Sequence, residues 1–170
     1  RQGLGQYQKA DANYRKLLSR RLSNVKMRDE IIFAMAENAE QRGQWQTAMQ
    51  TLSNNYKQLS NGARTRAKAR MADYYLQSGS TKKARRHRRE ALKAFKPKKA
   101  KSDMPLKDAM ARMEYNYLQS SHQRYLKLQL TDRLDNKIVA AKTKQLETLE
   151  KKYQKVLKYQ SPPWPLRACY

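Results

Sequence analysis

Apolar residues recur every three or four positions along most of the chain, the spacing that places them on one side of an α-helix. In the clearest example they fall at i, i+3, i+4 and i+7, as Ile32, Met35, Ala36 and Ala39. No alternating pattern is long enough to indicate a β-strand. The pattern predicts helices over residues 6–21, 28–41, 45–58, 64–77 and 81–95, with one or two long helices between 106 and 159.

A pair of small residues recurs between these predicted helices, 38 and then 36 residues apart: Gly5 with Ala10, Gly43 with Ala48, and Gly79 with Ala84. Glycine tolerates the left-handed backbone conformation that a tight turn after a helix requires. An early alanine lets the second helix approach the first closely. Self-similarity at this period predicts a stack of helix–turn–helix units, none of which can bury its apolar side alone.

These positions resemble the tetratricopeptide repeat over about residues 1–121, as two full repeats with partial ones on either side. The matching residues are Ala36, Gly43 and Ala48 in one copy and Ala72, Tyr75, Gly79, Ala84, Ala91 and Leu92 in the next. The resemblance implies an all-α solenoid of stacked helical hairpins. The spacing exceeds the family's 34 residues, and Arg88 occupies a position that is usually aromatic.

Prolines and charge divide the chain further. We expect helical repeats over residues 1–95 and a basic loop over 96–105, where two prolines end the helical pattern. A third repeat-like helix and a long amphipathic C-terminal helix should fill residues 106–160, followed by a Pro- and aromatic-rich tail over 161–170. Because the chain begins within a repeat and lacks a polar cap, we expect it to belong to a longer protein.

The net charge is +24, from 38 basic and 14 acidic residues. Between Thr81 and Lys101 there are eleven Lys or Arg residues and one acid, Glu90. A field of this strength attracts polyanions such as nucleic acid, an acidic protein or an anionic membrane surface, although a charge run also occurs as a merely solvated helix face. The residues that we expect to bind a polyanion are Arg85, Arg86, Arg88, Arg89, Lys98 and Lys99.

In the tetratricopeptide-repeat family, the first helix of each repeat lines a concave surface that binds peptides. Carried over by position, the resemblance implies a partner-binding set on this face: Phe33, Glu37, Glu40, Arg70, Asp73 and Leu76. The Lys/Asn pattern with which some members clamp a terminal carboxylate is absent, because other residues, including Phe33 and Ala69, stand there. We therefore do not expect an acidic C-terminal tail to be the ligand.

No motif predicts catalysis. His87 and His122 have no Cys or carboxylate at metal-ligand spacing, and Cys169 is the only cysteine, so it forms neither a disulfide framework nor a zinc site. No glycine-rich phosphate loop is present. We expect a protein that is not an enzyme and has no metal and no cofactor.

Two classes of function remain. The first is a non-catalytic scaffold that binds a partner peptide or helix through the concave face, and the resemblance favours it. The alternative is a helical module that binds nucleic acid without sequence specificity through the basic segment 82–101. The sequence has no transmembrane stretch and no signal peptide, which predicts a soluble protein of the cytoplasm or periplasm.

Overall fold

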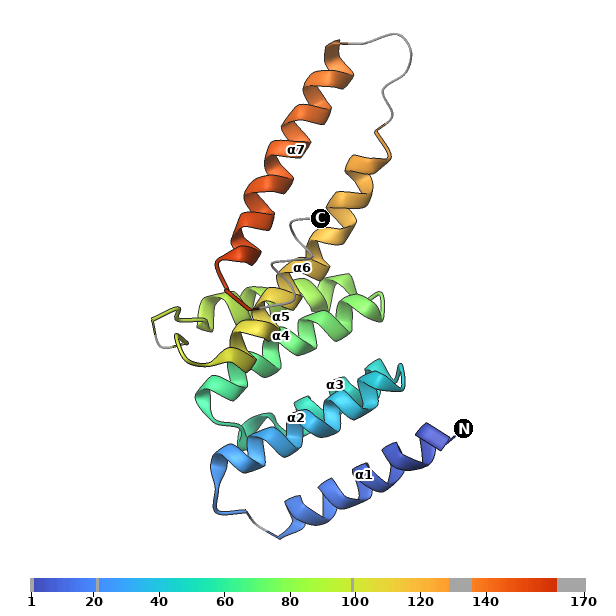
Figure 1. The fold of residues 1–170 in the computed structure, drawn as a ribbon, viewed down its shortest axis with the longest axis vertical. Coiled ribbons are helices and arrows are strands. Elements are labelled where there is room, and N and C mark those ends of the chain that lie inside the picture. Colours follow the sequence, from blue (N-terminus) through green and yellow to red (C-terminus); the bar gives the residue numbers. More distant parts are fainter. Residues whose placement is uncertain (1, 21, 99, 129–135, 162–170) are drawn as a thin grey trace. The chain divides into compact units, whose positions relative to one another are not determined.

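The computed structural model describes residues 2–20, 22–98, 100–128 and 136–161 (Figure 1). Within these ranges all regular structure is helical, so the predicted all-α class is confirmed. The elements are α1 (Gln2–Ser19), α2 (Val25–Gln41), α3 (Trp45–Asn55), the short 3-10 helix η1 (Tyr56–Gln58), α4 (Asn61–Gln77), α5 (Thr81–Ala94), α6 (Met104–Leu126) and α7 (Asn136–Leu157).

The chain forms two compact units, Arg1–Lys96 with helices α1 to α5 and Pro97–Tyr170 with helices α6 and α7. In the first unit each helix packs against the next in chain order. Its core consists mainly of apolar residues from α2, α3 and α4, and the largest side chains in it are Phe33, Ile32, Leu52, Leu59 and Tyr74.

Four helices begin earlier than predicted, and three of them, α2, α4 and α6, have a polar capping residue upstream of the first apolar position. The side chain of Asn24 accepts a hydrogen bond from the backbone N–H of Met27, 3.0 Å away, at the start of α2. Ser60 caps α4, and Asp103 accepts from the N–H of Leu106 at the start of α6. Each cap satisfies a backbone donor that the helix leaves unpaired.

Two of the three recurring glycine–alanine pairs have the roles that the sequence predicts, whereas Gly5 lies inside α1 in the same helix as Ala10 and forms no turn. Gly43 and Gly79 adopt φ values of +69° and +77°, where a side chain would strain the backbone, and they end α2 and α4. Ala48 and Ala84, five residues later, are buried. The turns of the α2–α3 and α4–α5 hairpins are therefore built in the same way.

Enlarging one of these alanines should destabilise the first unit. Ala48→Leu should lower the free energy of unfolding by about 1–3 kcal/mol, because the site is fully buried and cannot accommodate the added carbons without strain. Urea unfolding followed by circular dichroism measures the loss. The matched control is Gln50→Leu on the exposed side of α3, which should change stability by less than about 0.5 kcal/mol. Equal effects would contradict the packing role.

The second unit contains the antiparallel helices α6 and α7, which pack against each other (Figure 1). Ala111, Leu118 and Val156 are buried between them, and three tyrosines pack around this core. The sequence predicts either one or two long helices in this region, and the described residues form two, α6 and α7. The residues between them, 129–135, lie outside the described ranges, as do residues 162–170 of the predicted tail, Cys169 included.

Candidate functional site

Two of the three acidic residues predicted to meet a partner, Glu37 and Glu40, instead lie in a row of ion pairs between α2 and α4. Guanidinium nitrogens of Arg66 lie 3.1 Å from a carboxylate oxygen of Glu30 and 3.6 Å from one of Glu37. Arg70 lies 3.6 Å from Glu37 and 2.5 Å from Glu40. The order along the row is Glu30, Arg66, Glu37, Arg70 and Glu40, with acids from α2 and arginines from α4. We call this row the charge ladder.

The ladder becomes more buried towards Glu40. The side chains of Glu30 and Glu37 are 53% and 46% exposed, whereas those of Arg70 and Glu40 are 7% and 10% exposed. At its buried end the Tyr74 hydroxyl donates to Glu40 at 3.0 Å and accepts from Arg70 at 3.0 Å. Burial raises the pKa of Tyr74 well above its ordinary value, so this hydroxyl keeps its proton and remains a donor.

These positions correct part of the predicted partner face. Phe33 is buried in the core with the Arg66 guanidinium 3.8 Å from its ring centre, and Arg70 and Asp73 are also buried. The arginines of α4 reach across to α2 and neutralise its acids, so these side chains serve packing and charge pairing. Of the six predicted residues, Glu37 and Leu76 keep substantial solvent contact, and Glu40 keeps little.

Three further acids of the first unit, Asp11, Asp29 and Glu90, also form ion pairs or hydrogen bonds within the protein. Asp11 forms an ion pair with Arg42 at 2.6 Å, and Asp29 accepts a hydrogen bond from the Ser60 hydroxyl at 2.6 Å. On α5, Glu90 lies 3.1 Å from Arg86 and 3.4 Å from Lys68. Desolvation opposes ionisation of Glu90, but Arg86 and Lys68 outweigh it and lower the pKa of this carboxyl. Most acids therefore have a partner, and the surplus of basic residues remains.

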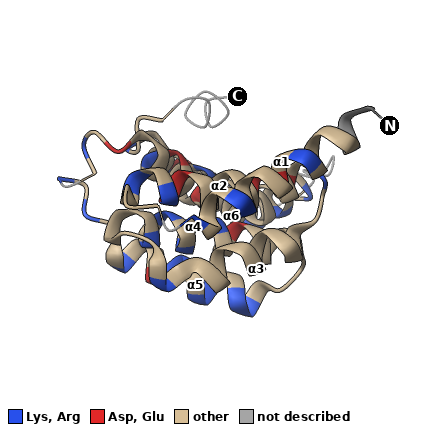
Figure 2. Ribbon diagram, turned by 90° about the horizontal axis from the view of Figure 1, so that it is seen from below, with Lys and Arg blue, Asp and Glu red and all other residues tan. Residues whose placement is uncertain are grey.

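Part of this surplus lies on α5, where several positions of the ribbon are basic (Figure 2). Five of its six exposed cations are spaced at i, i+3, i+4, i+7 and i+11, namely Lys82, Arg85, Arg86, Arg89 and Lys93, whereas Lys83 lies to the side of this row. We call these five residues the α5 basic stripe. The buried Ala84 and Ala91 occupy the opposite side of the helix. At a rise of 1.5 Å per residue, the stripe is about 16 Å long.

Charge compensation along the stripe is confined to Arg86. Within the described ranges, no ion pair joins Lys82, Arg85, Arg89 or Lys93 to a carboxylate. His87, between these cations in sequence, stacks on Tyr75 with ring centres 5.2 Å apart. Burial lowers the pKa of His87, so its imidazole adds no charge near neutral pH. The stripe thus presents four uncompensated positive charges.

Only part of the predicted polyanion-binding set lies together in the structure. Arg85, Arg86 and Arg89 lie together on the exposed stripe, whereas Arg88 is half-buried on the side of the helix that packs. Lys98 is exposed but belongs to the second unit, and Lys99 lies outside the described residues. The set omitted Lys82 and Lys93, although their spacing from Arg86 and Arg89 indicates the same helix side.

No group of three or more His, Cys, Asp or Glu residues in the described part of the chain is placed to hold a metal ion. None of the described helices is long and apolar enough to cross a membrane. Comparisons with known proteins returned no matching family model, no matching curated protein and no matching solved structure.

Proposed function

We propose that this chain is a non-catalytic binding module built from tetratricopeptide-like helical hairpins, and that its α5 basic stripe binds the backbone of nucleic acid. The observation that carries the proposal is the row of exposed, uncompensated cations on one side of α5. The repeat assignment draws support from two hairpins with the same turn glycine and buried alanine.

The dimensions and chemistry of the stripe suit a phosphate backbone. Successive phosphates of one duplex strand are about 3.4 Å apart along the axis, so a stripe of about 16 Å matches the axial rise of four or five of them. Arginine and lysine both pair with phosphate oxygens. The stripe contains no Asn, Gln or aromatic residue that would read or stack on a base. We therefore expect binding that is nearly independent of sequence.

A second candidate function is the binding of a partner peptide or helix along α2 and α4. The half-exposed carboxylates of Glu30 and Glu37 and the partly exposed Leu76 favour it. This surface is smaller than the predicted concave face because Phe33, Arg70 and Asp73 are buried. Substitution of Leu76 would weaken the binding of such a partner, whereas substitutions on α5 would leave its binding unchanged.

Neutralising the stripe should abolish most of the nucleic-acid affinity. The variant Lys82→Gln/Arg85→Gln/Arg89→Gln/Lys93→Gln should bind a fluorescent DNA duplex about a hundredfold or more weakly at 0.1 M salt, because each lost phosphate contact contributes close to tenfold there. Fluorescence anisotropy measures the change.

The matched control removes four exposed lysines from other parts of the first unit: Lys9, Lys16, Lys26 and Lys57. Each is changed to Gln, so both variants lose the same net charge. The control should lose much less affinity, since these lysines affect the duplex only through the screened long-range field. Equal losses in the two variants would show diffuse attraction and contradict the stripe. Circular dichroism confirms that both variants remain helical.

A further inference from the structure

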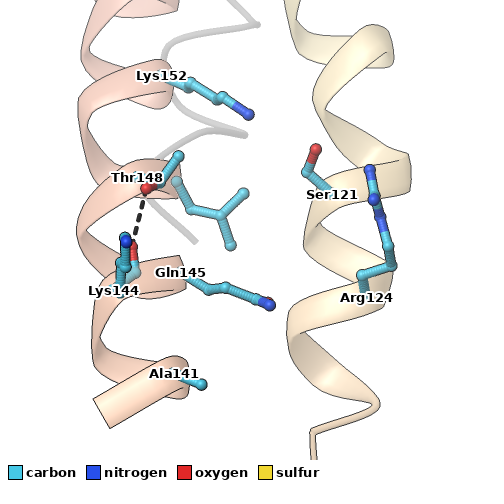
Figure 3. Close-up of a pocket in the computed structure, with 8 residues that line it drawn as sticks. Ser121, Arg124, Ala141, Lys144, Gln145, Thr148 and Lys152 are labelled. Carbon is cyan, nitrogen blue, oxygen red and sulfur yellow. Dashed lines mark hydrogen bonds between the residues drawn. The ribbon is translucent and has the colours of Figure 1, made fainter.

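A pocket of about 390 Å³ lies between α6 and α7 in the second unit (Figure 3). Ser121 and Arg124 line it from α6, and the remaining residues come from α7. A pocket of this volume is within the range of small-molecule sites. It shares no residue with the α5 basic stripe, so it requires an explanation of its own.

The lining is cationic. Arg124, Lys144 and Lys152 contribute three positive charges, and no carboxylate lines the pocket. In Figure 3 the side chain of Lys152 extends from α7 towards α6, and Arg124 lies on the facing helix. The acids Glu147 and Glu150 are each adjacent in sequence to a lining residue, but helical periodicity places both on the other side of α7.

Apolar and hydrogen-bonding residues of α7 also line the pocket, and their spacing of three or four residues places them on the same side of the helix. Leu149, which is only 5% exposed, gives the pocket an apolar base, and Ala141 adds a small apolar residue two turns earlier on α7. The Thr148 hydroxyl donates to the Lys144 carbonyl at 2.8 Å, so its oxygen can still accept a hydrogen bond. The Gln145 side chain extends from α7 towards α6 (Figure 3).

We propose that this pocket binds a nucleoside phosphate. Its phosphates would pair with Arg124, Lys144 and Lys152, which supply charge-assisted hydrogen bonds. The flat apolar base would cover Leu149, and the sugar hydroxyls would donate to Thr148 or accept from Gln145. A ligand with only one of these parts leaves either the cations or the apolar surface without a partner.

Titration calorimetry of the full chain with ADP, pyrophosphate and adenosine tests the ligand class. At 0.15 M salt, where exposed charges are strongly screened, ADP should bind at least about tenfold more tightly than either fragment, because both parts of the pocket are then occupied. Pyrophosphate binding as tightly as ADP would overturn the nucleoside assignment. Absence of ADP binding at millimolar concentration would overturn the site.

Variants locate the site. Two single variants, Lys152→Gln on α7 and Arg124→Gln on α6, should each lower the affinity for ADP about tenfold. This is the effect of losing one charge-assisted hydrogen bond. The matched control is Lys151→Gln, which removes the same charge from the adjacent residue, outside the pocket lining. Lys151→Gln and the stripe variant Arg89→Gln should keep the parental affinity. An equal loss in Lys151→Gln, or full affinity in both pocket variants, would overturn the assignment.

Discussion

Replacing Arg70 by Met should lower the free energy of unfolding of the first unit by about 3–5 kcal/mol, the usual cost of removing one partner from a buried ion pair. The Arg70 side chain is 7% exposed, and its guanidinium contacts both the carboxylate of Glu40 and the hydroxyl of Tyr74. Its loss leaves a nearly buried carboxylate with no cation within the ladder. Urea unfolding followed by circular dichroism measures the change.

The control for this prediction removes the whole buried end of the charge ladder. The triple variant Arg70→Met/Glu40→Leu/Tyr74→Phe leaves no buried charge and no orphaned hydroxyl at these three positions, so it should recover most of the lost stability. Arg66→Met should cost less than Arg70→Met, because its partners Glu30 and Glu37 are about half exposed. A loss below about 1 kcal/mol in Arg70→Met would contradict a stabilising role for the pair.

The affinity of the protein for duplex DNA should fall steeply with salt. Four phosphate contacts predict a slope of about −3.6 for log K against log salt, and hence roughly a 150-fold loss between 50 and 200 mM. The four contacts correspond to the uncompensated cations Lys82, Arg85, Arg89 and Lys93. Anisotropy titrations at several salt concentrations give the slope, since each neutralised phosphate releases its condensed counterion.

Two duplexes of unrelated sequence serve as the specificity control, and their affinities should agree within about threefold, because phosphate contacts carry no sequence information. The stripe variant should show a much shallower slope, because the remaining cations act on the duplex only through the screened long-range field. Tight binding that is insensitive to salt, or strong selectivity for one duplex, would contradict the proposed mechanism. Absence of binding at low salt would leave an acidic protein as the partner that the stripe fits.

The sequence predicted the helices well because apolar periodicity and punctuation by glycine and proline are local signals. Gly43 and Gly79 were recognisable because a left-handed turn needs a residue without a side chain. The starts of α2 and α4 were missed because Asn24 and Ser60 extend each helix through a side-chain hydrogen bond that apolar periodicity does not register.

The site was harder to predict because it depends on which residues meet across helices. Positions carried over from a family indicate a face, but they do not indicate that Arg70 reaches Glu40 on α2. Phe33 was assigned to the surface for the same reason, although Arg66 covers its ring. The α5 basic stripe was partly predictable, because its charge and its helical spacing can both be read from one short segment of the sequence.

The charge ladder also limits how the two hairpins can slide past each other. Arg66 and Arg70 are one helical turn apart on α4, and each is placed between two acids of α2. A shift of one turn, about 5.4 Å, would remove the ladder partner of Glu40 in one direction and that of Glu30 in the other, because only one arginine would still lie between two of the acids. Alanine-lined helices alone would tolerate several such offsets. The alternating charges therefore select a single register between neighbouring hairpins.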